Sequence, residues 1–283
     1  MPKHDSTIIT ASDPNIGLSK NSFYIPEDRS ERRYGPVPSF QDVFDIVHIS
    51  QYGMKEAFDE TCWDREVHFR ILSLALRHSS VPIKDGLVNF TALTAAAIHT
   101  NFMKDTPGQM VNFCVYIDPK ALGLREPAIA TAVNHVRSIS GYSSVNHTSL
   151  FHLRNKPISL SMKSKQRHAS LDDAHLHIGT WHAAQWIYSE RLVSQRGAVL
   201  QRIASLPGLI VQAEDWHFMA STLEGILWSK KIIGSTSDLE GAYQVIRVIQ
   251  YLAWWTEAAY WPWYLSTVLG LGIMGDKPQA ANT

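Results

Sequence analysis

Two lysines separated by one residue are the side chains of this chain best placed to do chemistry. Lys163 and Lys165 end the stretch from Pro157 to Lys165, in which we expect a β-strand. Side chains two residues apart on a strand point to the same face, so we expect both ammonium groups on one face of a sheet. Together they could act as an acid, a base or a binding site for an oxyanion. The alternative interpretation is a pair of solvated lysines that protects a sheet edge.

A second expected strand, from Met110 to Ile117, carries an amide near its start, Asn112. An amide is a weaker ligand than a carboxylate for a hard divalent cation, and an ammonium group in the ligand shell repels such a cation. We therefore expect no metal ion at a site that contains Asn112 or Lys163. The sequence also lacks a Gly-x-Gly-x-x-Gly motif, a phosphate-binding loop and a Gly-x-Ser-x-Gly elbow, so we expect no cofactor and no serine hydrolase chemistry.

Two further candidates for acid–base chemistry lie on expected helices. His177 has an imidazole that titrates near neutrality, although a histidine in a Trp-rich helix is most often structural. Its neighbours His175 and His182 share a helix face from which His177 is displaced, and the His-x-His spacing disfavours a zinc site. Glu66 is the candidate carboxylate partner for the lysines, or half of an ion pair with Lys165 that merely takes the place of a metal ion.

Candidate substrate-binding residues surround Trp216. Asp215 and His217 flank this indole on an expected strand and share the face opposite to it, although polar residues at a strand end are commoner as turn residues. Trp181, on the same expected helix as His177, is the other candidate. A dense aromatic series from Trp254 to Tyr264 predicts a core or a dimer contact, or the wall of an apolar pocket.

The fold class that these elements indicate is α/β (α+β), with a mixed central sheet flanked by helices. Hydrophobic periodicity, helix caps and turn residues define the elements. Helices are expected from Ser39, from about Cys62 to Arg77, over Thr91 to Ile98, from Pro127 to Val136, from Leu171 to about Val193, and from Asp238, with a buried terminal helix over Tyr260 to Ile273. Strands are expected over Met110 to Ile117, Ser143 to Leu153, Ile158 to Met162, Leu209 to Ala213, His217 to Leu223 and Ile226 to Ile233.

Bulk composition sets limits on the class of protein. The 283 residues include 26 Lys and Arg against 26 Asp and Glu, so no overall basic field would attract nucleic acid. We expect a polar arm over residues 1–36 that is partly disordered, one domain over 37–273 and a disordered tail over 274–283. Cys62 and Cys114 are expected to be reduced, buried thiols. Without an expected secretory signal or membrane span, we predict a cytoplasmic protein, with a nuclear location left open.

Several segments together resemble a fungal branch of the PD-(D/E)XK nuclease-like proteins, over roughly residues 36–268. The order and spacing of these segments carry the resemblance more than any one of them. They are Cys62-Trp63-Asp64-Arg65-Glu66-Val67-His68, Asn89-Phe90-Thr91, Met110-Val111-Asn112-Phe113-Cys114, Ser144-Val145-Asn146-His147-Thr148, Pro157-Ile158, Leu176-His177-Ile178-Gly179-Thr180-Trp181 and Val211-Gln212-Ala213-Glu214-Asp215-Trp216-His217.

The resemblance implies a restriction-endonuclease-like core in which a helical Glu, a strand Asp and a Glu-x-Lys pair surround one or two metal ions. Glu66 corresponds to the helical Glu and Lys165 to the Lys. Asn112 stands in place of the Asp, Lys163 in place of the Glu, and His177 where many relatives have Gln. Both central metal ligands are replaced, so the resemblance implies a degenerate metal site.

We therefore expect a metal-independent enzyme on a nuclease scaffold, a pseudonuclease turned to secondary metabolite biosynthesis. It would act as a cyclase, pericyclase, dehydratase or isomerase on a small apolar molecule of fungal specialised metabolism. The alternative is a catalytically dead pseudonuclease that binds nucleic acid or a protein partner; nucleic acid is the less favoured partner, and a homodimer is open. Residual nuclease activity with displaced acids, such as Asp118 or Asp172, ranks last.

Overall fold

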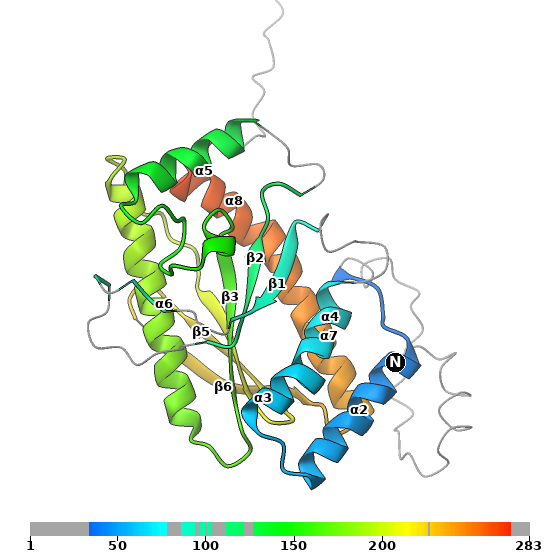
Figure 1. The fold of residues 1–283 in the computed structure, drawn as a ribbon. Coiled ribbons are helices and arrows are strands. Elements are labelled where there is room, and N and C mark those ends of the chain that lie inside the picture. Colours follow the sequence, from blue (N-terminus) through cyan, green and yellow to red (C-terminus); the bar gives the residue numbers. More distant parts are fainter. Residues whose placement is uncertain are drawn as a thin grey trace, which may run out of the picture.

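The computed structural model describes residues 34–77, 86–93, 97–99, 101–102, 111–121, 127–225 and 227–272, with the side chains of 227–230 left out. The tail over 274–283 and all but the last three residues of the expected arm lie outside this part of the chain. The described residues form a mixed sheet with helices on both of its faces, as expected for the fold class (Figure 1).

The sheet has six strands in the spatial order β1 to β6. They are β1 (Val88–Ala92), β2 (Phe113–Ile117), β3 (Ile158–Lys165), β4 (Leu206–Gln212), β5 (Asp215–Ser221) and β6 (Leu227–Ser235). β3 and β4 run parallel and are connected through a long helix, whereas the other neighbours pair antiparallel. Strand β3 is thus central, which is why seven of its eight residues are buried.

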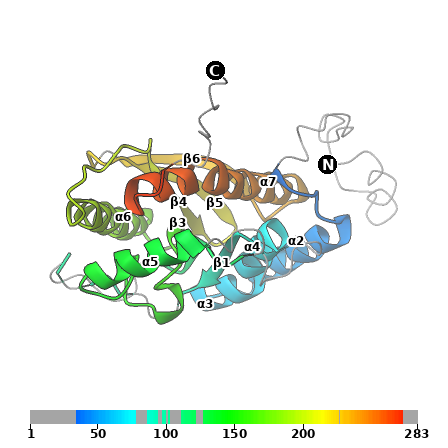
Figure 2. The same ribbon diagram turned by 90° about the horizontal axis from the view of Figure 1, so that it is seen from above.

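Helices cover the two faces unequally. One face carries α6 (Leu171–Ser194), and the other carries α2 (Phe40–Lys55), α4 (Phe69–Leu76) and α7 (Leu239–Trp255), as seen from the side in Figure 1 and from above in Figure 2. The alternation along β3 follows these layers. Leu160 and Met162 belong to the core under α2, α4 and α7, while Ile210, opposite Lys163 on β4, belongs to the core under α6.

A continuous helical segment runs from Glu60 to Leu76 and contains a π-helical turn. It comprises α3 (Glu60–Trp63), η3 (Asp64–His68) and α4. Asp59 caps its start, since the Asp59 carboxylate accepts a hydrogen bond from the Cys62 amide at 2.8 Å. π-Helical turns inside α-helices occur frequently at functional sites.

The chain closes with a second interrupted helix over the aromatic series. After α7 it continues through η5 (Thr256–Tyr260), α8 (Trp261–Trp263) and η6 (Tyr264–Val268). The Tyr260 hydroxyl donates to the Ile158 carbonyl at 2.7 Å, which ties this segment to the start of β3. The aromatic series is mostly core, which is one of the three interpretations that the sequence left open. Among the described residues, no helix combines the length and apolarity that crossing a bilayer requires.

Three local expectations are wrong. Thr91 and Ala92 belong to strand β1 and not to a helix, while residues 94–96 of that expected helix lie outside the described part. Residues 143–150 form an irregular loop instead of a strand, followed by the short 3-10 helix η4 (Phe151–Leu153) and preceded by helix α5 (Pro127–Ile139). Both cysteines are free, but Cys62 is exposed and only Cys114 is buried.

Candidate functional site

Strands β2 and β3 bring Asn112 and Lys163 together, as the sequence predicted. Phe113 lies opposite Met162, and the backbone N–H of Asn112 donates to the backbone carbonyl of Met162 at 2.8 Å. The Lys163 ammonium donates to the Asn112 Oδ1 at 2.8 Å, although Lys163 keeps only 5% of its surface exposed. A lysine so deeply buried requires anionic or polar partners, because burial in a low dielectric disfavours its charge.

The Asn112 side chain uses its full hydrogen-bonding capacity. Its Oδ1 accepts from Lys163 Nζ and from the Ser164 backbone N–H at 3.2 Å. Its Nδ2 donates to Glu60 Oε1 and to Asp64 Oδ2, both at 2.8 Å. Turning the amide over would place NH₂ against two donors and oxygen against two carboxylates, so this network fixes its orientation.

The anionic partners come from the start of the interrupted helix. Glu60 and Asp64 are four residues apart and point to the same side, where Glu60 Oε1 also accepts from Lys163 Nζ at 3.0 Å. Figure 1 shows α3 close to β3, and Lys163 lies toward the C-terminal end of that strand. The ammonium of Lys163 thus occupies a position between a carboxylate oxygen and an amide oxygen.

His68 continues the series one further turn along. Its ring has no exposed surface, and its Nδ1 lies 3.0 Å from Asp64 Oδ1 while its Nε2 lies 2.8 Å from the Ala213 carbonyl oxygen. Trp63 stacks on the ring and Trp216 meets it edge-on. Ala213 itself has a φ of 52°, a left-handed conformation that is uncommon without glycine. His68 therefore connects the site helix to the turn between β4 and β5.

Glu66 lies elsewhere, which corrects its expected pairing with the lysines. Its carboxylate is 3.3 Å from Arg70, and the two side chains are 42% and 49% exposed. Two residues after Asp64, Glu66 points about 200° around the helix, away from Asn112. The carboxylates that meet Asn112 are Glu60 and Asp64, which the sequence analysis missed. The spacing Glu60, Asp64, His68, four residues at each step, was the available signal.

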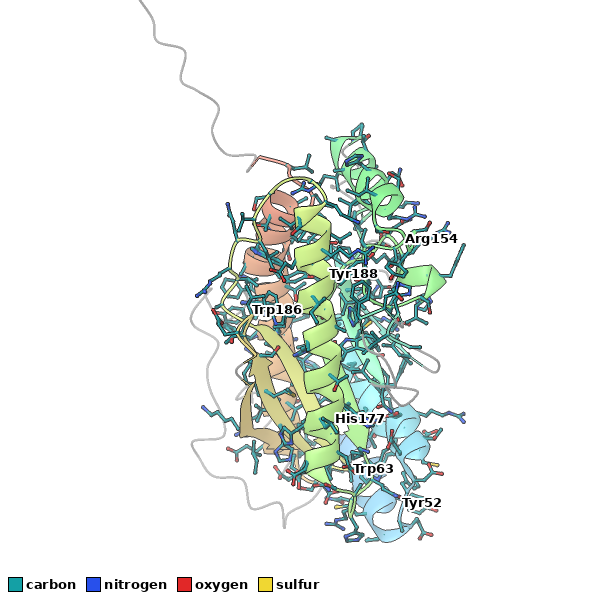
Figure 3. All side chains as sticks on the ribbon, turned by 90° about the vertical axis from the view of Figure 1, so that its left-hand side faces the viewer. Tyr52, Trp63, Arg154, His177, Trp186 and Tyr188 are labelled. Atoms are coloured by element: carbon teal, nitrogen blue, oxygen red, sulfur yellow. The ribbon has the colours of Figure 1, made fainter. Side chains whose placement is uncertain are left out.

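Lys165 and His177 approach the cluster without hydrogen bonding to it. Lys165 shares the strand face of Lys163 and is half-buried at the end of β3. His177 is half-buried on α6 and lies in the lower half of the view in Figure 3, whereas Arg154 lies in the upper half. Burial, and then the charges of Lys165 and Lys163, lower the pKa of His177, while Asp173 and Glu60 partly offset them. Its Nδ1 is buried without a partner among the described residues.

The expected substrate-binding residues do not gather at one surface. Trp181 and Trp216 have no exposed surface and belong to the cores on opposite faces of the sheet, so neither offers a contact to a ligand. Asp215 is exposed and His217 half-buried on β5. Burial is the main cause that lowers the pKa of His217; Asp215 opposes it and His175 on α6 adds to it.

A cleft of about 600 Å³ opens beside the cluster. Its volume falls in the range of small-molecule sites. Glu60, Asp64 and Asn112 form the polar part of its lining, and Lys163 lies behind them. Its complete lining is Glu60, Thr61, Asp64, Arg65, Phe69, Ala92, Leu93, Asn112 and Phe113. The cleft is partly open and lies on the helix side of Asn112, and its lining does not include Lys163, Lys165 or His177.

The side chains at this site do not fit a divalent metal ion. A hard cation needs several oxygen ligands with net negative charge, but the oxygens of Glu60 and Asn112 already bind the Lys163 ammonium. Among the described residues, no group of three His, Cys, Asp or Glu side chains is arranged to hold a metal.

Comparison with known proteins gives one match. The sequence matches the family model described as the PD-(D/E)XK nuclease superfamily over residues 8–261. No curated protein and no solved structure matches the chain. The matched range includes the interrupted helix and strands β2 and β3, which carry the cluster around Asn112. This chain belongs to the PD-(D/E)XK nuclease superfamily.

Proposed function

We propose that this chain is a metal-independent enzyme that acts on a small, mainly apolar organic molecule by acid–base or electrostatic catalysis. The observation that carries the proposal is the Lys163 ammonium, 3.0 Å from Glu60 Oε1 and 2.8 Å from Asn112 Oδ1. A fixed protein cation there performs the charge neutralisation that a metal ion would otherwise provide. Membership in a nuclease superfamily does not by itself define the reaction.

The cleft supports a small-molecule substrate over a nucleic acid. The charged residues of its lining are Glu60, Asp64 and a single basic residue, Arg65, whereas nucleic-acid sites are lined with several Lys and Arg. Phe69, Leu93 and Phe113 give it apolar walls. This arrangement favours the enzyme over the alternative of a pseudonuclease that binds nucleic acid.

The reactions that suit these groups are isomerisation, cyclisation, dehydration and pericyclic reactions, which need no redox partner. In an isomerisation, a carboxylate such as Asp64 would accept a proton from one substrate atom and return it to another. Asn112 and His68 would hold that carboxylate in place, because both form hydrogen bonds with it and Lys163 in turn donates to Asn112. Dehydration would add the release of one water molecule.

Metal binding can be tested without knowing the substrate. Calorimetry with Mg²⁺ and Mn²⁺ should detect no heat of specific metal binding to the native chain. The double variant Asn112→Asp with Lys163→Glu should gain Mn²⁺ binding. If the double variant folds only with metal, metal-dependent refolding reports the same gain. Tight binding of Mn²⁺ at this site of the native chain would overturn the proposal.

Turnover can be sought in metabolite extracts that contain a chelator. Mass spectrometry should reveal a compound that the native chain consumes and that Asp64→Asn leaves unchanged. Glu66→Gln is the matched control, since Glu66 lies on the same helix but pairs with Arg70 outside the cleft. Hydrolysis of DNA or RNA that a chelator abolishes would contradict the proposal.

A further inference from the structure

The charges around the cleft can be paired one by one, beginning with Glu60. Its carboxylate forms an ion pair with the Lys163 ammonium at 3.0 Å, so these two groups together carry no net charge. Lys163 keeps 6% of its side chain exposed and Glu60 keeps 34%, so the negative partner faces the cleft and the positive partner lies beneath it.

Hydrogen-bond accounting gives the charge of the second pair, Asp64 and His68. The Ala213 carbonyl oxygen only accepts, so the His68 Nε2, 2.8 Å away, carries a hydrogen. The Nδ1 of His68 and the Oδ1 of Asp64 are 3.0 Å apart, and two bare lone pairs at that distance would repel. One more proton must lie between them. Whether nitrogen or oxygen holds this proton, the pair has no net charge.

Arg65 is the remaining charge in the lining of the cleft. No acidic partner for its guanidinium occurs among the described residues, in contrast to Arg70, which pairs with Glu66 at 3.3 Å. Because Lys163 balances Glu60 and the Asp64–His68 pair has no net charge, the cleft has one net positive charge. It belongs to Arg65, and the apolar side chains of Phe69 and Phe113 line the same cleft.

We propose that the cleft binds a mainly apolar molecule with a single carboxylate, which pairs with Arg65 while the apolar part lies against Phe69, Leu93 and Phe113. This inference rests on the proposed function only in taking the cleft as the substrate site. It names the substrate class: a small apolar carboxylic acid, in preference to a neutral or cationic compound. A guanidinium is suited to this role because its planar donors match both carboxylate oxygens.

Three matched probes test this charge preference: 2-naphthoic acid, 2-naphthamide and 2-naphthylmethylamine. In a titration followed by NMR of the full chain, the acid should bind best and should shift the signals of Phe69 and Phe113. The acid should exceed the amide by roughly fivefold, the upper range for a solvent-exposed ion pair. Arg65→Gln should remove this difference, and Arg70→Gln should keep it.

Equal or better binding of the amide or the amine would overturn the inference, as would acid binding that maps elsewhere or no binding of the acid at millimolar concentration. These outcomes leave the metal calorimetry above untouched, so failure of this inference is distinguishable from failure of the proposed function.

The neutral Asp64–His68 pair has its own test. Nitrogen-15 NMR of the His68 ring, with carbon-13 NMR of the Asp64 carboxyl, should find a proton on Nε2 and one more on either Nδ1 or the carboxyl. A bare Nδ1 beside an ionised Asp64 would give the cleft no net charge and would overturn the argument for an anionic substrate.

Discussion

Two kinds of buried histidine lie on opposite sides of the central sheet. His68, on the interrupted helix from Glu60 to Leu76, has a partner at each ring nitrogen: Asp64 at 3.0 Å and the Ala213 carbonyl at 2.8 Å. His147, under α6, is just as inaccessible but has no partner at either nitrogen among the described residues, and it lies edge-on to Trp181 at 4.3 Å. His182, nearby on α6, has one partner, the Ser221 hydroxyl at 2.9 Å.

Burial alone therefore does not turn a histidine into a catalytic or binding residue. Burial lowers the pKa of both His147 and His182 to about 3, with His182 and His99 adding to the effect on His147. These two imidazoles are therefore neutral at physiological pH and serve as packing groups. His68 instead belongs to a network in which every polar group is held by another, the arrangement that pre-organised sites require.

Removing the buried ammonium of Lys163 should have the largest effect on the stability of the fold. Lys163→Met would leave the Asn112 Oδ1 with one donor and Glu60 without its cation. We expect a loss of about 3 kcal/mol in the free energy of unfolding, the lower range for breaking a buried ion pair, since Glu60 remains partly solvated. Urea denaturation measures the change, and Lys165→Met, at the half-buried end of the same strand, is the control. An equal loss in both variants would contradict the special position of Lys163.

Replacing His68 should have the next largest effect. His68→Gln keeps a donor for only one of the two acceptors, Asp64 Oδ1 or the Ala213 carbonyl. Leaving one buried acceptor unpaired should lower the free energy of unfolding by about 2 kcal/mol. The same denaturation experiment tests it, with the packing-equivalent change His147→Phe as its counterpart. If His147→Phe at pH 7 costs as much as His68→Gln, the two environments do not differ as described.

The buried His147, on the α6 side of the sheet, should make the free energy of unfolding depend on pH. A histidine with a folded pKa of about 3 and an unfolded pKa near 6.5 binds its proton only when the chain unfolds, so stability is lost as the pH falls from about 6.5 toward 3. His147→Phe should reduce this slope by about 1.4 kcal/mol per pH unit in that window. Unfolding free energies at several pH values test this, with His135→Phe, on the surface of α5, as the control. An unchanged slope would mean that His147 is already protonated in the folded chain.

The exposed ion pair on the site helix should give the smallest effect. Glu66→Gln removes a contact of 3.3 Å between two side chains that are each more than 40% exposed. Such pairs contribute little, so the free energy of unfolding should change by less than about 0.5 kcal/mol. A loss above 1 kcal/mol in thermal or urea denaturation would show that Glu66 has a partner beyond Arg70.

Periodicity predicted most of the fold, and side-chain hydrogen bonding explains where it failed. Strand β3 and helices α6 and α7 were predicted because their apolar spacing is regular. The expected strand over Ser143 to Leu153 has apolar and β-branched residues, but Asn146 satisfies the loop instead: its Nδ2 donates to the Leu153 and Lys156 carbonyls and its Oδ1 accepts from the Ile158 amide. A side chain thus replaces the ladder that a neighbouring strand would provide.

The site was predictable on its strands and not on its helix. Side chains along a strand alternate between only two faces, so the faces of Lys163 on β3 and of Asn112, directly before β2, could be predicted. Side chains on a helix can point in many more directions. Choosing Glu60 and Asp64 instead of Glu66 would have required knowing where the helix begins and which side of it faces the sheet. Trp181 and Trp216 failed as binding residues because composition cannot tell an indole in a core from one in a cleft.

The position of Lys163 has a consequence for how the site is supplied with charge. A metal centre is filled after folding and can be stripped by chelators, starved, or occupied by the wrong ion. The amine at this centre is synthesised as part of the polypeptide and arrives in fixed stoichiometry with every molecule. Under the proposed function, activity would therefore not depend on the supply of metal ions, because the cation of the site is encoded in the sequence.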